Sequence, residues 1–300
     1  MDSYIIQKLL FASLLMTFQV ISRSENQSFN DSADLTLPPS YRISWMSSID
    51  DYKRISEITI PGTHDTMALH GGPPAECQAW SLADQLRAGI RYLDLRVFAL
   101  EHTLYIMHGV VYQHTTFSTV LSTIRDFLKE HRSEAVLVRV KPDLIDKDKV
   151  EGMVAQLITG DEDVWVKSDI PRMGDVRGKI VLLQKDSFKL GIPILGTDKK
   201  DDYEVTHIDE KERKIETHLQ EAERECGGGD YVVLSYSSGT GIGTLEGMFL
   251  TPKRVAEKID PWFYGYLNGL DLRKGSCLGI IAMDFPGLDL IQTVIHLNQF

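Results

Sequence analysis

From residue 41 to the C-terminus, short runs of β-branched and aromatic residues alternate with longer segments that repeat apolar positions at helical spacing. The short runs predict strands at residues 57–61, 92–98, 104–108, 135–141, 179–184, 231–235 and 277–284. The periodic segments predict helices at residues 81–88, 117–130, 150–158, 212–224, 252–267 and 288–297. Because strands that alternate with helices pair in parallel, we expect a single-domain α/β fold, a (β/α) barrel of the TIM type. The strands at 92–98 and 104–108 are separated by a short loop instead of a helix, which predicts a distorted barrel.

The first forty residues differ from this pattern. Lys8 precedes an apolar run at residues 9–21, which is shorter than the roughly 20 apolar residues of a membrane span. The run predicts a cleaved signal peptide at residues 1–24, with a membrane anchor as the alternative. A polar linker follows at residues 25–40, and its N-glycosylation sequons begin at Asn26 and Asn30. We therefore expect a secreted, extracellular glycoprotein whose barrel domain spans residues 41–300.

The composition narrows the classes of partner. The formal net charge of −11 argues against nucleic acid, because phosphate backbones need clustered Lys and Arg. After residue 25 the chain has no segment that is apolar enough to cross a membrane, so we expect only peripheral membrane contact by a monomer. The three cysteines, Cys77, Cys226 and Cys277, allow at most one internal disulfide, and their pairing stays open.

The predicted strands end in charged residues. In a barrel of this kind the carboxyl ends of the strands form one rim, which is where the chemistry takes place. Five of these ends carry His64 with Asp65, Asp94 with Arg96, His108, Lys141 and Asp284, respectively. Taken singly, each has an ordinary structural explanation, such as a turn histidine, a helix cap or an Asp–Arg pair on one strand face. Their convergence on one rim favours a functional site.

Two histidines, carboxylates and cations together suit the cleavage of a phosphodiester. A neutral histidine removes a proton from the attacking hydroxyl, and a protonated one donates a proton to the leaving oxygen. A carboxylate fixes the tautomer of each imidazole, and Asp284 and Asp65 are the candidates. Arg96 is the candidate for stabilising the charge that develops on the phosphoryl oxygens.

The motifs IPGTHDT at residues 60–66, YLDLR at 92–96 and IMHG at 106–109 resemble the X-domain of phosphatidylinositol-specific phospholipase C, in its bacterial form. RGKIVLL at 177–183 and SYSSG at 235–239 extend the resemblance, which covers residues 41–300. It implies cleavage of phosphatidylinositol, or of a related inositol lipid in a membrane, to diacylglycerol and inositol 1,2-cyclic phosphate.

The resemblance also assigns roles to individual residues. His64 would be the general base held by Asp284, and His108 the general acid supported by Asp65. Arg96 would bind the phosphate, with Asp94 positioning it. For the inositol ring it implies contacts from Lys141, Lys185, Asp209 and Tyr236. Lys211 stands where the bacterial enzymes have a tyrosine that stacks on the ring, so this contact is either absent or supplied by Tyr203 or Tyr236. The tolerance of phosphorylated or glycosylated inositol therefore stays open.

We expect no metal and no cofactor. Calcium needs six to eight oxygen ligands, and Arg96 and Lys141 place fixed cations at two of the strand ends where such ligands would stand. The alternatives are a glycerophosphodiester phosphodiesterase, which would need carboxylates around a metal, and a catalytically weak or inactive secreted protein that binds lipids or the glycans of GPI anchors. The presence of His64, His108, Asp65, Asp284 and Arg96 favours an active enzyme.

Overall fold

The computed structural model of the protein describes residues 27–143, 147–184, 186–198, 202–273 and 275–300. The expected signal peptide at residues 1–24 lies outside these ranges. Within them, no helix has the length and apolar character that a membrane span requires.

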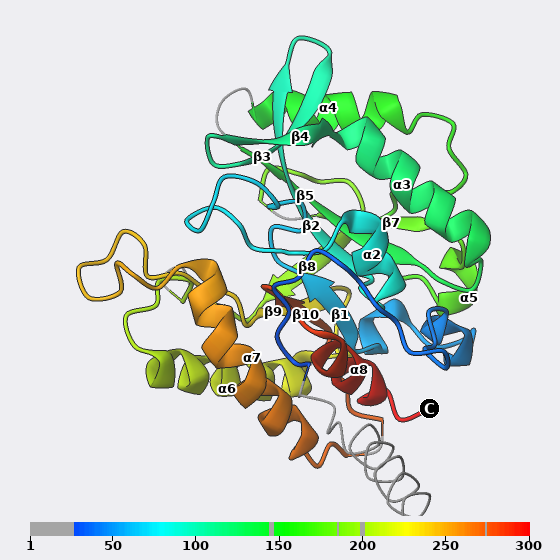
Figure 1. Cartoon of the computed structure of the whole chain (residues 1–300). Helices are drawn as coiled ribbons and strands as arrows, with labels where there is room; N and C mark the ends of the chain where they lie inside the picture. The colour runs from blue at the N-terminus through cyan, green and yellow to red at the C-terminus, as the bar shows by residue number, and fades with distance from the viewer. Residues whose placement is uncertain (1–26, 144–146, 185, 199–201, 274) are drawn as a thin grey trace, which may run out of the picture.

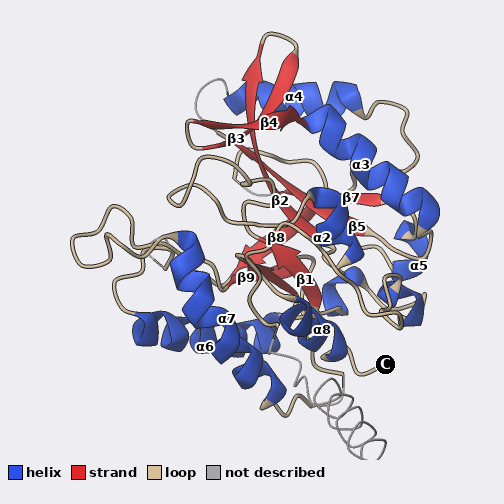
Figure 2. Cartoon of the chain, viewed as in Figure 1, coloured by secondary structure: helices blue, strands red, loops and turns tan. Residues whose placement is uncertain are grey.

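A parallel barrel forms the centre of the molecule, and the helices surround it (Figures 1 and 2). Its strands are β1 (Ile60–Thr63), β2 (Tyr92–Leu100), β5 (Val136–Pro142), β7 (Ile180–Gln184), β8 (Ile192–Gly196), β9 (Val232–Tyr236) and β10 (Ile280–Met283). They pair in the order β1-β10-β9-β8-β7-β5-β2, and a β1–β2 pairing closes the ring. That pairing is short, joining only Gly62 to Tyr92 and Thr63 to Leu93. All carboxyl ends of these strands therefore meet at one rim, as the alternating pattern predicted.

The distortion of the barrel comes from β2. This strand continues past its pairing with β1 and forms an antiparallel ladder with β3 (Thr103–His108), which pairs in turn with β4 (Val111–Thr116). A two-residue strand, β6 (Val164–Trp165), pairs with β7. The β3–β4 hairpin matters for the site because β3 carries His108 at its end.

The helices are α2 (Leu82–Arg87), α3 (Phe117–Glu130), α4 (Lys147–Leu157), α5 (Met173–Val176), α6 (Ile208–Glu225), α7 (Pro252–Asn268) and α8 (Leu288–His296), with 3-10 turns at Trp45–Ser48 and Ile55–Glu57. Helix α3 matches its prediction because its apolar residues all lie on one buried face, and Thr116 caps its first turn. Helix α6 begins at Ile208, earlier than the predicted residue 212, which changes the direction of the side chains that follow.

Two contacts tie distant parts of the chain to the barrel. A disulfide joins Cys226, which follows α6, to Cys277, which precedes β10, and Cys77 is left as a buried free thiol. The described end of the expected linker also contacts the barrel, because the backbone N–H of Asn30 donates to the carbonyl of Phe285 at 2.8 Å. Residues 27–30 therefore lie against the loop between β10 and α8.

Candidate active site

A cavity of about 410 Å³ opens at the carboxyl ends of the strands. Most of its lining residues are polar or charged, and the charges are of both signs. The residues that line it are His64, Asp94, Arg96, Arg139, Lys141, Asp186, Asp198, Asp202, Tyr203, Lys211, Tyr236 and Ser238. This location is the rim where the strand-end residues were expected to meet.

His64 and His108 face a single carboxylate. Asp65 Oδ2 lies 3.3 Å from His64 Nε2 and 3.2 Å from His108 Nε2. The other nitrogen of each ring has its own partner, because His64 Nδ1 lies 2.9 Å from Asp284 Oδ1 and His108 Nδ1 lies 2.6 Å from the carbonyl of Ala75. In both rings the Nδ1 contact is shorter than the contact of Nε2 with Asp65, so we assign the proton of the neutral ring to Nδ1. This leaves Nε2 as the atom that gains or loses a proton.

The local backbone explains how β1 and β10 present these groups. An added Cβ at Gly62 would lie 2.5 Å from Tyr92 Cδ1, so only glycine allows β1 to approach β2 this closely. Two residues after each strand the backbone adopts a left-handed conformation, with φ of 39° at Asp65 and 47° at Phe285. Gln78 joins the two ends, since its Nε2 donates to the carbonyls of His64 at 2.8 Å and Met283 at 2.9 Å.

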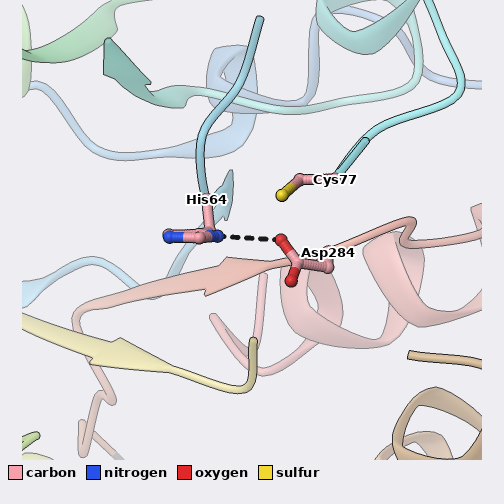
Figure 3. A group of neighbouring side chains, drawn as sticks. All are labelled: His64, Cys77 and Asp284. Carbon is pink, nitrogen blue, oxygen red and sulfur yellow. Dashed lines mark hydrogen bonds and ion pairs between the residues drawn. The ribbon is translucent and has the colours of Figure 1, made fainter. Parts of the chain in front are cut away.

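Figure 3 shows the His64–Asp284 pair with the sulfur of Cys77 pointing toward it. His64 is 5% exposed and Asp284 is 2% exposed, so the pair is almost dehydrated. Burial opposes a charge on His64, but the carboxylates of Asp65 and Asp284 outweigh it and raise the pKa of His64 above 6.5. Burial likewise opposes the charge on Asp65, yet His64, Arg96 and His108 lower the pKa of that carboxyl, so it stays ionised.

Two cations face the cavity from neighbouring strands. Arg96 Nε contacts Asp65 Oδ1, and one of its terminal nitrogens lies 3.4 Å from His64 Nε2. Lys141 is the parallel partner of Arg96 in the β2–β5 ladder. Burial, followed by the charge of Arg96, lowers the pKa of Lys141. Two adjacent cations that repel each other in a partly dehydrated site suit an anion such as a phosphodiester.

Asp94 has a different partner from the one expected. Its Oδ1 lies 3.1 Å from a terminal nitrogen of Arg139, and its ion-pair partner is therefore Arg139 instead of Arg96. Arg139 also donates to the Tyr236 hydroxyl at 2.8 Å. Arg139 was not among the predicted site residues, although its position two residues before Lys141 on one strand indicates that both point to the same face.

The segment between β8 and α6 also lines the cavity, with Tyr203, which was a candidate for stacking on the ring, and with Asp198 and Asp202, which were not predicted. Tyr203 places its ring 5.1 Å from that of His64, and Asp198 and Asp202 supply carboxylates. The expected role of Asp209 does not fit its position: it does not line the cavity, its side chain is 74% exposed, and it pairs with Arg213 at 3.2 Å. Asp209 lies in the first turn of α6, in a segment that was expected to be a loop. Tyr236 lines the cavity, and Lys185 lies outside the described residues.

The described residues contain three groups of side chains that are close enough to share an ion. They are His64 with Cys77 and Asp284, Asp65 with Cys77 and His108, and His64 with Asp65 and Asp94, in each of which the ligand atoms lie within 4.8 Å of one another. Asp65 already contacts Arg96, and each group offers three donors of mixed type. This does not fit the cage of six to eight oxygens that calcium prefers.

The chain is similar in sequence to a known protein family and to curated proteins of two bacteria. Residues 53–186 match the family described as phosphatidylinositol-specific phospholipase C, X domain. The chain is 30% identical over 281 residues to the 1-phosphatidylinositol phosphodiesterase of Listeria monocytogenes, and the match covers 85% of each protein. The same-named protein of Staphylococcus aureus strain NCTC 8325 is 29% identical over 149 residues, covering 48% of this chain and 44% of the relative.

The solved structures agree with the sequence comparison. The phosphatidylinositol-specific phospholipase C of Listeria monocytogenes superimposes with a TM-score of 0.71 at 27% identity, covering 87% of this chain and 100% of the other. A Staphylococcus aureus structure of the same name, at 19% identity, gives a TM-score of 0.71 over 86% of this chain and 98% of the other, which shows the shared fold.

Proposed function

Because the chain belongs to the phosphatidylinositol-specific phospholipase C family, we propose that it cleaves the phosphodiester of phosphatidylinositol without a metal ion. The products are diacylglycerol and inositol 1,2-cyclic phosphate. The observation that carries this proposal is the pair of histidines, His64 and His108, whose Nε2 atoms face one carboxylate, Asp65, beside Arg96.

The first step is the attack of the inositol 2-hydroxyl on phosphorus. His64 Nε2 accepts the hydroxyl proton as general base, and Asp284 stabilises the imidazolium that forms through its contact with Nδ1. His108 gives its Nε2 proton to the diacylglycerol oxygen as the P–O bond breaks, while the carbonyl of Ala75 fixes the ring. One proton enters His64 and one leaves His108, so the total charge of the two histidines does not change. The starting state returns when His64 releases its proton and His108 takes one up from solvent.

The second requirement is stabilisation of the charge on the phosphoryl oxygens. Arg96 is 18% exposed in its side chain and is held in place by Asp65, so it meets the developing charge without reorganising. Lys141 adds a second cation on the neighbouring strand. Removing one such preorganised donor lowers kcat by about 10²- to 10³-fold in other enzymes.

An apolar rim supports action at a lipid surface. The loop between β9 and α7 exposes Ile242, Leu245, Met248 and Phe249, and Leu245 is 95% exposed. Figure 1 shows this loop extending away from the body of the molecule beyond α7. Val110, in the β3–β4 turn next to His108, is 85% exposed. A net charge of −11 gives little attraction to anionic lipids, so we propose that apolar side chains make the peripheral membrane contact.

We also propose that the protein is secreted and glycosylated. The disulfide between Cys226 and Cys277 supports an oxidising compartment, in agreement with the apolar run of residues 9–21. The Asn30 side chain is partly exposed, although its Nδ2 donates to the carbonyl of Ser32 at 2.9 Å. Detection of the protein in culture medium, with a mass shift on glycosidase treatment, would test both points.

The test of the activity is release of water-soluble inositol phosphate from phosphatidylinositol vesicles in excess EGTA. We expect the wild-type protein to release the cyclic product and the His64→Ala variant to release none. His102→Ala is the matched control, because His102 is an exposed histidine in the β2–β3 turn. Activity that appears only on addition of calcium would overturn the metal-independent mechanism. A folded wild-type protein that releases nothing under either condition would contradict the proposed function.

A further inference from the structure

Lys211 is a buried lysine that the proposed reaction does not use. It lies in the first turn of α6, is 3% exposed, and lines the same cavity as His64 and Arg96. Its Nζ donates to the backbone carbonyl of Asp202 at 2.9 Å, which is the one hydrogen bond found for this ammonium among the described residues. An ammonium has three N–H groups, so two donors remain for a ligand in the cavity.

The surroundings of Lys211 explain why it is retained as a cation. Burial lowers its pKa to about 8, and the carboxylates of Asp284, Asp202 and Asp198 act in the opposite direction. Gly239 allows the loop after β9 to run beside the lysine stem, since an added Cβ there would lie 2.6 Å from Val205 Cγ2 and 3.5 Å from Lys211 Cε. The side chain is thus positioned by packing as well as by its hydrogen bond.

The neighbouring groups indicate what kind of ligand would contact Lys211. Asp198 lines the same cavity and acts on the charge of Lys211, and its buried Oδ1 has no hydrogen-bond partner among the described residues, so it can accept a hydrogen bond beside the donor. The carboxylate of Asp202 is already engaged by His218 Nε2 at 3.0 Å. Vicinal hydroxyls on a ring, each both a donor and an acceptor, match that arrangement. The phosphate-binding cations Arg96 and Lys141 lie on β2 and β5, whereas Lys211 is supplied separately by α6.

We propose that Lys211 is a head-group-binding residue that donates hydrogen bonds to ring hydroxyls and thereby contributes to specificity for a cyclic polyol. The inference rests on the proposed phospholipase activity, because that activity supplies the substrate. A direct binding test with the head group alone does not depend on it. Lys211 does not transfer a proton in this scheme. Its loss therefore weakens head-group binding and leaves the proton transfers at His64 and His108 in place.

The test compares Lys211→Met with Lys214→Met. Lys214 lies one turn further along α6, also approaches Asp202, at 3.6 Å, and is the matched control because it does not line the cavity. Losing a hydrogen bond from a charged donor predicts that Lys211→Met raises KM for phosphatidylinositol by about 10- to 100-fold, with kcat changed far less. The inhibition constant of myo-inositol should rise by a similar factor, while that of inorganic phosphate stays unchanged.

Several results would overturn the inference. One is an unchanged KM and unchanged inhibition by myo-inositol in Lys211→Met. Another is equal weakening of myo-inositol and inorganic phosphate, which would indicate a disturbed fold. If Lys211→Met does not fold, Lys211→Gln, which keeps a donor for the Asp202 carbonyl, takes its place. If the wild type has no lipase activity, calorimetric titration of both proteins with myo-inositol decides on Lys211 alone.

Discussion

The contact between Asp284 and His64 leads to a quantitative prediction for the variant Asp284→Asn. The substitution keeps the shape of the side chain and removes a negative charge 2.9 Å from Nδ1 of a buried imidazole. For two charges about 4 Å apart at an effective dielectric constant near 20, the lost interaction is about 4 kcal/mol. Since a pKa unit corresponds to about 1.4 kcal/mol, roughly 3 units is the upper limit for the fall in the pKa of His64.

The assay is the pH dependence of kcat/KM, which reports ionisations of the free enzyme. In the wild type, His64 must lose its proton to act as a base, so kcat/KM falls as the pH drops through a pKa above 6.5. In Asp284→Asn we expect this acid limb to move down by roughly 1–3 pH units. We also expect the plateau to fall by about 10²- to 10⁴-fold, because the base is weaker and its tautomer is no longer fixed.

The matched control for this prediction is Asp260→Asn. Asp260 is a buried carboxyl of α7 that is 1% exposed, and burial raises its pKa well above the usual value. A raised pKa favours the neutral acid, so the amide removes less charge here than it does at position 284. Because Asp284 also contributes to this raised pKa of Asp260, we expect an acid limb that moves far less than in Asp284→Asn. An acid limb of Asp284→Asn that does not move, or moves upward, would refute the reasoning that this carboxylate sets the protonation of His64.

Three further predictions concern folding and the membrane. The Cys226–Cys277 disulfide closes a loop of 51 residues, so in the chain-entropy model Cys226→Ser with Cys277→Ser lowers the free energy of unfolding by about 4 kcal/mol, measurable by urea denaturation. An unchanged urea midpoint would contradict this. Arg139→Met leaves the buried carboxylate of Asp94 without its partner and should lower the free energy of unfolding by about 3–5 kcal/mol. The double variant Arg139→Met with Asp94→Asn should recover part of the lost free energy of unfolding. If it recovers none, the loss does not come from breaking the Arg139–Asp94 ion pair. Phe249 is 72% exposed, so Phe249→Ser should leave the melting temperature nearly unchanged but weaken vesicle binding by roughly 10- to 100-fold. Equal loss of activity on a soluble inositol phosphodiester would rule out a purely membrane-directed role.

The barrel could be predicted because its strands are buried on both faces and read as continuous apolar runs, such as β7 (Ile180–Gln184). The strands that were missed lack this signal. In β8 (Ile192–Gly196), Pro193 and the flanking glycines interrupt the run, and in β4 (Val111–Thr116) polar residues dominate. The start of β1 was placed too early because residues 55–57 form a 3-10 turn, and the strand extends instead through Gly62.

The site residues also differ in how well the sequence predicts them. Groups at strand ends, such as His64, Arg96 and Asp284, could be located because barrel geometry sends every strand end to one rim. Asp202 and Tyr203 reach the cavity from the irregular segment between β8 and α6, where no periodicity indicates direction. The ion-pair partner of Asp94 could not be predicted from the sequence either. Arg96 and Arg139 are both near its strand, and only the strand register in the structure assigns Asp94 to Arg139.

The left-handed backbone at Asp65 and Phe285 sets a limit on engineering this protein for heat resistance. Such conformations cost about 1–3 kcal/mol each in residues other than glycine, so a screen for stabilising substitutions would target both positions. Glycine at 65 would remove the carboxylate that His64 and His108 share. Glycine at 285 would remove a buried ring whose centroid lies 6.1 Å from that of Phe29. Gains in thermal tolerance should therefore come from the outer helices, because glycine at 65 would lower turnover and glycine at 285 would lose the packing of a buried ring.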